Sequence, residues 1–177
     1  LIDAAVESGA DCVKFQMRDL SSLYLNTGDA GDHREDLGSQ YTLDLLTRFQ
    51  LSDKEMFRAL DRCQDSGVIP LVTPWDLASM SKLEDYGIEG YKTASADFTN
   101  HPLLLSLADT GKPLICSTGM TTEAEVRETV NLLVSKGCQF ALLHCNSTYP
   151  TPFKDINLRY METLREIGGC PTGYSSH

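Results

Sequence analysis

Short apolar runs alternate along the whole chain with stretches in which apolar residues recur at helical spacing. The apolar runs predict strands over 11–16, 68–73, 90–95, 113–117, 139–145 and 171–175. The helical spacing predicts helices over 1–6, 77–86, 102–109 and 155–167, and two more that begin after Ser52 and Thr122. Strands that alternate with helices are typical of a parallel sheet with helical crossovers.

The beginnings of three helices can be read from capping residues. Ser52 and Thr122 are each followed three residues later by Glu, which is the pattern of a capping box. We therefore assign Glu55 and Glu125 to helix caps and to no function. Asn100 precedes the helix that begins at 102 and can cap it. The segment between the first strand and Ser52 is predicted as a polar loop.

Two architectures fit this order of elements: an open doubly wound sheet, or an incomplete (β/α)8 TIM barrel whose first and last strands are missing. An open sheet builds its site near one switch point, whereas a barrel gathers all its strand ends around one mouth. The barrel is favoured because nearly every strand ends in polar residues, namely Lys14-Phe15-Gln16, Thr73-Pro74-Trp75, Lys92-Thr93-Ala94-Ser95, Ser117-Thr118-Gly119, His144-Cys145-Asn146-Ser147 and Ser175-Ser176-His177. We interpret 1–177 as one partial barrel domain and as part of a longer protein.

Composition narrows the class of protein. Lys and Arg number 15 against 25 Asp and Glu, so the net charge of −10 argues against nucleic acid as a partner. No apolar stretch approaches the roughly 20 residues of a membrane span, so no membrane partner is predicted. The 6 cysteines include no C-x-x-C pair and lie mostly in apolar runs, where a thiol acts as a small hydrophobe. They favour a reducing, cytoplasmic setting.

The strand ends also suggest a chemistry. Lys14 and Lys92, together with the hydroxyls of Ser95, Ser117 and Thr118, predict a site for a phosphate or carboxylate group. The alternative is that each lysine lies at a rim with its stem packed on apolar surface.

Three other side chains, Asp97, His144 and Trp75, each have two interpretations, and His177 has one. Asp97 could bind a sugar hydroxyl or begin a solvated loop, and His144 could act at the site or be a core histidine bonded to backbone. His177 is the better candidate metal ligand because it follows the last strand. Trp75 is interpreted as packing rather than as a pocket wall.

These strand endings, in this order, resemble the N-acetylneuraminate (sialic acid) synthase family. The matching runs are Gly9 to Gln16, Thr73-Pro74, Tyr91-Lys92, Ala94-Ser95, Thr99-Asn100, Gly111 to Pro113, Ser117 to Met120, His144-Cys145, Ser147, Tyr149 to Pro152, Asp155, Asn157 to Arg159, Gly173 to Ser175 and His177. The resemblance implies a homodimeric enzyme in which a Glu-bearing strand precedes this chain. A second metal-binding His and an antifreeze-like domain would follow it.

The resemblance also implies the reaction. Phosphoenolpyruvate condenses with N-acetylmannosamine or a related amino sugar, and phosphate is released. The methylene carbon of phosphoenolpyruvate attacks the sugar aldehyde, and a divalent metal, Mn or Mg, polarises that aldehyde. The resemblance assigns catalytic roles to Lys14, Lys92 and Asp97, substrate contacts to Gln16, Thr73, Ser95, Ser117, Ser147, Tyr149 and Ser175, and the metal to His177.

The chain departs from the family pattern at three positions. Ser176 stands where many members have Asp, Ala96 where many have Gly, and Ser147 where many have Asn. These changes leave room for a different sugar. Two other functions stay open: a Schiff-base aldolase that uses Lys14 or Lys92 as nucleophile, and a non-catalytic sugar-phosphate binding protein.

Overall fold

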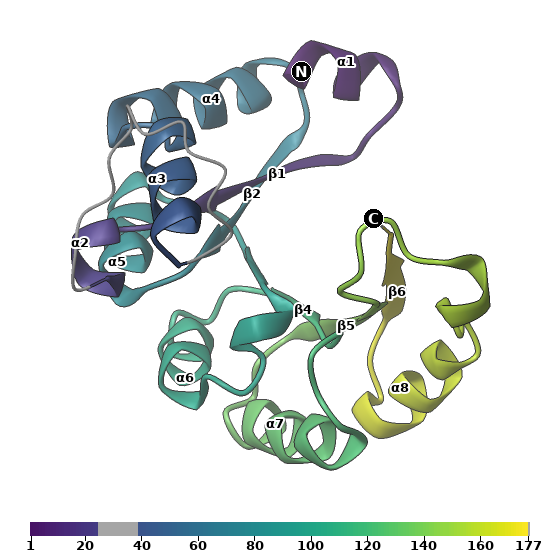
Figure 1. Cartoon of the computed structure of the whole chain (residues 1–177). Helices are drawn as coiled ribbons and strands as arrows, with labels where there is room; N and C mark the ends of the chain where they lie inside the picture. Colours follow the sequence, from purple (N-terminus) through teal and green to yellow (C-terminus); the bar gives the residue numbers. More distant parts are fainter. Residues whose placement is uncertain (25–38, 177) are drawn as a thin grey trace. The chain divides into compact units, whose positions relative to one another are not determined.

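The computed structural model describes residues 1–24 and 39–176 and has an α/β fold (Figure 1). The strands of the described chain form a six-stranded parallel sheet in the order β1-β2-β3-β4-β5-β6. The strands are β1 Cys12–Met17, β2 Ile69–Pro74, β3 Tyr91–Thr93, β4 Leu114–Ser117, β5 Phe140–Cys145 and β6 Thr172–Ser175. The helices are α1 Ile2–Glu7, α2 Leu20–Leu23, α3 Ser39–Phe49, α4 Asp53–Asp65, α5 Leu77–Tyr86, α6 His101–Asp109, α7 Glu123–Ser135 and α8 Tyr160–Gly168, with 3-10 turns η1 Ser95–Asp97 and η2 Phe153–Asp155.

The chain divides into two compact units. The first comprises Leu1–Pro70 and Pro74–Gly87, and the second comprises Leu71–Thr73 and Ile88–His177. Within the described residues, no helix is both long enough and apolar enough to span a membrane.

The first unit is built on the pairing of β1 with the ends of β2. The Ile69 amide donates to the Asp11 carbonyl and the Trp75 amide to the Met17 carbonyl. Helix α4 buries Met56, Leu60 and Cys63 at helical spacing, and burial of such side chains contributes about 2 kcal/mol each. The expected capping box at Ser52 and Glu55 is present, so this helix begins where the sequence predicted.

The prediction of a polar loop before Ser52 is wrong in part. Helices α2 and α3 lie in this segment. The N-terminus of α2 is capped by Asp19, whose side chain accepts a hydrogen bond from the Ser21 amide, and α3 buries Leu43 and Asp44. In α3 the buried position 44 is an aspartate where the helical pattern expects an apolar residue. The apolar spacing therefore did not predict this helix.

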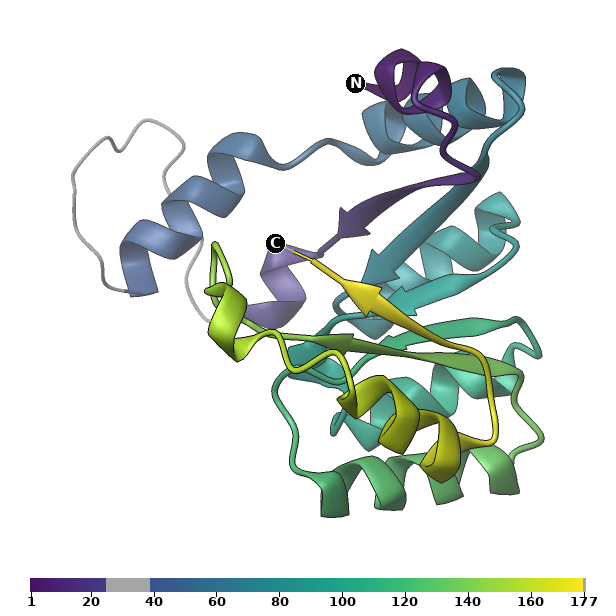
Figure 2. The same cartoon turned by 90° about the vertical axis from the view of Figure 1, so that its right-hand side faces the viewer.

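The second unit packs three helices on one face of β3 to β6. Figures 1 and 2 show α6, α7 and α8 on the same side of β4 and β5. Leu104, Leu107, Val126, Leu133 and Leu164 are fully buried there. The capping box at Thr122 and Glu125 and the Asn100 cap are both confirmed.

Register then determines which side chains share a face of the second unit. Tyr91 pairs with Leu114, Thr93 with Cys116 and Cys116 with Leu142, and these buried side chains face the helices. Because side chains alternate along a strand, Lys92 and Ser117 point to the opposite face.

Helix α8 begins later than expected, at Tyr160 instead of 155. The turn η2 ends at Asp155, and Asn157 adopts a positive φ of 50°, which a helix cannot continue through.

Candidate active site

The ammonium of Lys92 lies at the end of β3 in the second unit. Its Nζ donates a hydrogen bond of 2.6 Å to Ser117 Oγ on the neighbouring strand β4. Burial lowers the pKa of Lys92, and the nearby thiols of Cys145 and Cys116 oppose this shift. An ammonium carries three N–H donors, so a bond to Ser117 does not exhaust its capacity for an anion.

Ser95 lies two residues beyond β3, at the start of η1, and contacts residues at the ends of β4 and β5. Its Oγ accepts a hydrogen bond from the Gly119 amide at 3.1 Å and lies 2.9 Å from Cys145 Sγ. A Cβ at Gly119 would lie 2.6 Å from this sulfur and 2.7 Å from the Cys145 carbonyl oxygen. Only glycine therefore allows the loop after β4 to approach so closely.

Two more predicted residues share the face of Lys92. Thr73 is buried, and the pairing of Val72 with Tyr91 sets it beside Lys92. Ser175 is the register partner of Cys145 at the end of β6. The second unit therefore brings one ammonium and the hydroxyls of four predicted residues to the carboxyl ends of parallel strands, where α/β folds hold their ligands: Thr73, Ser95, Ser117 and Ser175.

Three predicted residues of this unit lie in loops. Asp97 is in η1, and its Oδ1 accepts a hydrogen bond of 3.1 Å from Asn100 Nδ2, the side chain that also caps α6. Ser147 and Tyr149 follow β5 and are exposed, Tyr149 by 70%. The side chain of Tyr149 is therefore accessible to a ligand.

Lys14 and Gln16 belong to the first unit and lie on the same face of β1. Gln16 Oε1 accepts hydrogen bonds from Trp75 Nε1 at 3.1 Å and from Arg18 Nη2 at 2.7 Å. The guanidinium of Arg18 stacks 4.1 Å above the Trp75 ring. This stack fixes the amide orientation of Gln16, so Trp75 both packs and supports a predicted site residue.

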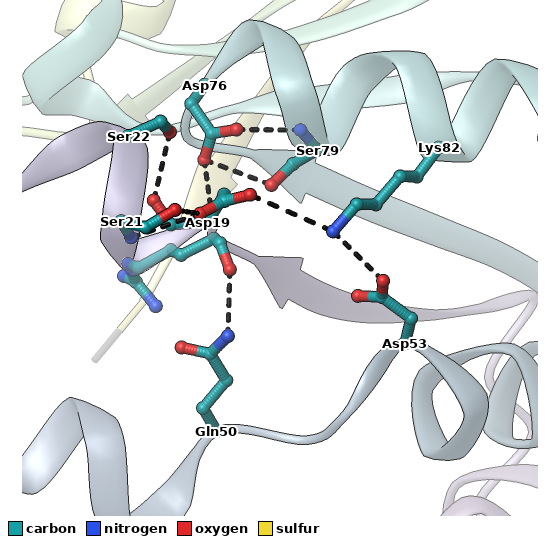
Figure 3. Close-up of polar contacts among 9 residues, drawn as sticks. Asp19, Ser21, Ser22, Gln50, Asp53, Asp76, Ser79 and Lys82 are labelled. Carbon is teal, nitrogen blue, oxygen red and sulfur yellow. Dashed lines mark hydrogen bonds and ion pairs between the residues drawn. The ribbon is translucent and has the colours of Figure 1, made fainter.

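A polar network that sequence reasoning missed supports the loops after β1 and β2 (Figure 3). Asp76 accepts hydrogen bonds from the Ser79 amide at 2.6 Å, the Ser79 hydroxyl at 3.0 Å and the Asp19 amide at 2.8 Å. Lys82 Nζ lies 2.9 Å from Asp53 Oδ2 and 3.8 Å from Asp19 Oδ2. The signal was present in the sequence, since Asp76 directly precedes a helix and Asp is a common N-cap.

A cavity of about 280 Å³ adjoins this network in the first unit. Its wall is partly apolar, with Phe49 and Met56, and partly polar, with Gln16, Arg18 and Asp53.

The interpretation of His144 as a core histidine is confirmed. Its Nε2 lies 2.6 Å from the Ile156 carbonyl oxygen, and its ring meets the Tyr160 ring edge-on at 5.4 Å between centroids. His144 faces the helices rather than Lys92, because it is the register partner of Tyr174 on the opposite face from Cys145.

The predicted metal ligand His177 lies outside the described residues. Among residues 1–24 and 39–176, no group of three or more His, Cys, Asp or Glu side chains is arranged to hold a metal. The described part of the chain therefore does not by itself provide a metal site, and the metal stays a prediction.

The sequence did not predict that Cys145 and Gly119 contact Ser95. All six cysteines are free thiols. Cys63 and Cys116 are buried as small hydrophobes, as expected, but Cys145 contacts the hydroxyl of a predicted site residue. Its position directly after His144, at the end of β5, was the available signal.

The sequence and the fold of this chain are similar to those of known proteins. A protein of Methanocaldococcus jannaschii is 37% identical over 180 residues, which cover 100% of this chain and 49% of that protein. The N,N'-diacetyllegionaminic acid synthase of Legionella pneumophila is 33% identical and is covered to 52% of its length. The N-acetylneuraminic acid synthetase structure from Leptospira borgpetersenii superposes with a TM-score of 0.85 at 30% identity, covering 99% of this chain and 57% of that chain.

The chain thus spans about half the length of the relatives it matches. The family model described as the NeuB family matches residues 1–177. The relatives of this chain include synthases of sialic and related acids. This chain belongs to the NeuB family.

Proposed function

We propose that the full-length protein containing this chain is a nonulosonic acid synthase. It condenses phosphoenolpyruvate with N-acetylmannosamine or a related amino sugar and releases phosphate. The observation that carries this proposal is the hydrogen bond of 2.6 Å between Lys92 and Ser117 at the ends of β3 and β4, from which the Ser95 and Gly119 contact continues. A positive charge with hydroxyl donors at strand ends suits a small ligand that bears both phosphate and carboxylate.

The binding step uses the residues of the second unit. Lys92 neutralises part of the ligand charge, and Thr73, Ser95, Ser117 and Ser175 supply hydroxyl donors around it. The family resemblance assigns Lys14 of the first unit to phosphoenolpyruvate as well. Ser147 donates from the loop after β5.

The chemical step forms one carbon–carbon bond. The methylene carbon of phosphoenolpyruvate attacks the aldehyde carbon, and the aldehyde π electrons move to its oxygen, which gains a proton. Water then adds to the resulting oxocarbenium carbon, and the tetrahedral intermediate expels phosphate. Negative charge develops on the aldehyde oxygen as the carbon–carbon bond forms and on the phosphate as it leaves, so fixed ammonium and hydroxyl donors stabilise these two transition states. The water that adds in between loses a proton.

Three residues face the sugar in this proposal. Gln16 presents its amide from a fixed orientation, because Trp75 and Arg18 hold its carbonyl oxygen. Asp97 is held by a hydrogen bond from Asn100 and accepts a hydrogen bond from a sugar hydroxyl. The exposed Tyr149 covers the sugar ring. Ala96 adjoins Asp97 in the sequence, Ser147 lies two residues before Tyr149, and Ser176 precedes His177. We propose that these departures affect which amino sugar fits.

The proposal extends to the whole protein. The six parallel strands in chain order are part of a (β/α)8 barrel, and 1–177 is one catalytic domain of a cytoplasmic homodimer. Size-exclusion chromatography with light scattering on the full-length protein tests the dimer. His177 is proposed to bind Mn or Mg, and treatment with a chelator followed by readdition of either ion tests that assignment.

The test of the function is phosphate release by the full-length protein. Phosphoenolpyruvate is incubated with Mn or Mg and each of a panel of N-acylated amino sugars. Phosphate must appear only when both substrates are present, and a sugar acid must form in equal amount. Release without any sugar, or no release with any sugar, would contradict the proposal.

A Schiff-base aldolase is the second candidate, because burial lowers the pKa of Lys92 and so favours an amine nucleophile. Pyruvate and borohydride distinguish the two. In an aldolase the amine of Lys92 or Lys14 condenses with the keto acid and releases water, and borohydride reduces the imine, so the protein gains the mass of the keto acid less one water plus two hydrogens. The synthase forms no imine and keeps its mass. A sugar-phosphate binding protein would bind phosphoenolpyruvate and turn over neither substrate.

A further inference from the structure

The contact between Ser95 and Cys145 has a consequence for the direction of hydrogen bonds in the site. A serine hydroxyl has one hydrogen to donate and two lone pairs that accept. The Gly119 amide donates to one lone pair of Ser95 Oγ at 3.1 Å. A single hydrogen bridges Oγ and Cys145 Sγ at 2.9 Å, and either atom can supply it.

The two possible arrangements differ in what they leave for a ligand. When Ser95 donates to sulfur, its only hydrogen is used inside the protein. When the Cys145 thiol donates, both lone pairs of Ser95 are filled and the hydroxyl hydrogen is left to point elsewhere. An anion accepts hydrogen bonds and cannot donate them, so only the second arrangement serves an anion site.

The Cys145 thiol, the Ser95 hydroxyl and the Gly119 amide lie close together at the ends of the strands. Cys145 is the last residue of β5 and is 6% exposed. Its sulfur and its carbonyl oxygen lie so close to the loop after β4 that a Cβ on Gly119 would be 2.6 Å and 2.7 Å from them. Cys145 also lies on the same sheet face as Lys92 and Ser117, unlike Cys116, which is buried on the opposite face.

We propose that Cys145 is a positioning residue for the anion site: its thiol donates to Ser95 Oγ, and the Ser95 hydroxyl is thereby directed to the phosphate or carboxylate of the ligand. This inference rests on the proposed function, because it assigns Ser95 to phosphoenolpyruvate. Cys145 itself touches no reacting atom.

The test is steady-state kinetics of the full-length protein with three substitutions at one position. Cys145→Ala removes the donor, Cys145→Val removes it while keeping the side chain bulky, and Cys145→Ser replaces it with a hydroxyl. Loss of one hydrogen bond to a charged ligand corresponds to about a tenfold rise in KM for phosphoenolpyruvate in the first two variants. Cys145→Ser should stay within about threefold of the parent, and KM for the sugar should not change in any of them.

Cys63→Ala is the matched control, because it also removes a buried thiol but from helix α4 of the first unit. It should leave KM for phosphoenolpyruvate unchanged. A Ser95→Ala background gives a second readout: if Cys145 acts through Ser95, adding Cys145→Ala there causes no further rise.

Three results would overturn the inference: an unchanged KM in both donor-free variants, a Cys145→Ser protein as impaired as Cys145→Val, or additive effects in the Ser95→Ala background. Parent activity is measured first. A parent that releases no phosphate contradicts the proposed function, whereas an active parent with insensitive variants contradicts only the role of Cys145.

Discussion

Replacing Lys92 by Met should abolish function while leaving the fold intact or more stable. The change keeps the length of the side chain and removes the ammonium that donates to Ser117. Two unit charges about 4 Å apart interact by about 4 kcal/mol at an effective dielectric of about 20. Since about 1.4 kcal/mol is a factor of ten, kcat/KM for phosphoenolpyruvate should fall by about a thousandfold.

Stability should respond in the opposite direction. Burial lowers the pKa of Lys92, so the folded protein holds this proton less strongly than the unfolded chain does. Charged Lys92 therefore opposes folding at neutral pH, and its cost is relieved as pH rises from the lowered pKa toward the ordinary value. Lys92→Met removes the cost, so its advantage in the free energy of unfolding should be largest at pH 7 and shrink at alkaline pH.

The assay combines turnover with urea unfolding at pH 7 and at alkaline pH. Lys136→Met is the control, because Lys136 is a lysine of the same unit that pairs with Asp109 at 2.7 Å on the surface. The control should keep its activity and lose little stability. The reasoning is refuted if Lys92→Met keeps near-parent kcat/KM, or if it unfolds more readily than the parent at pH 7.

Further predictions concern the supporting contacts. Gly119→Ala should raise KM for phosphoenolpyruvate by at least tenfold, because its Cβ would meet Cys145 Sγ at 2.6 Å and displace the amide from Ser95; an unchanged KM would show that the loop can yield. Asp76→Ala should lower the free energy of unfolding by about 2 kcal/mol, through loss of a helix cap and a tie to the Asp19 amide. Asp85→Ala on the exposed side of the same helix is its control, and equal losses in urea titrations would count against the network. Hydrogen bonds from Ser21 lower the pKa of Asp19, so its stabilising contribution is present above the ordinary pKa and is lost in acid as pH falls through the lowered value. Asp19→Asn should flatten this acid dependence in unfolding experiments, and an unchanged slope would refute the assignment.

Local chemistry explains why many elements could be predicted from the sequence. Capping boxes at Ser52 and Thr122 set helix starts through bonds between neighbouring residues, so no tertiary information was needed. The same holds for the end of α5, where Gly87 adopts a positive φ of 87°. Helix α3 was missed because it buries Asp44. Burial of a carboxylate depends on contacts with other parts of the fold, which the pattern of apolar residues along the chain does not reveal.

The candidate site was predicted in part for a similar reason. Lys92 and Ser117 were predicted as site residues because each is polar and lies at the end of a strand. Their hydrogen bond forms because the two strands, β3 and β4, are neighbours in the sheet. Cys145 was treated with the other cysteines as a small hydrophobe, because its place at a strand end does not reveal that the Ser95 hydroxyl lies against the thiol. That contact depends on register and on the missing side chain of Gly119.

The central claim is that phosphoenolpyruvate is joined to a sugar through carbon and then loses phosphate from a tetrahedral carbon. It is tested most directly with phosphoenolpyruvate labelled with 18O at the oxygen that bridges carbon and phosphorus. The full-length protein, given a suitable amino sugar, should release phosphate that carries the label, because the carbon–oxygen bond breaks. Unlabelled phosphate, with 18O retained in the carbon product, would mean that the phosphorus–oxygen bond breaks, and would contradict the mechanism.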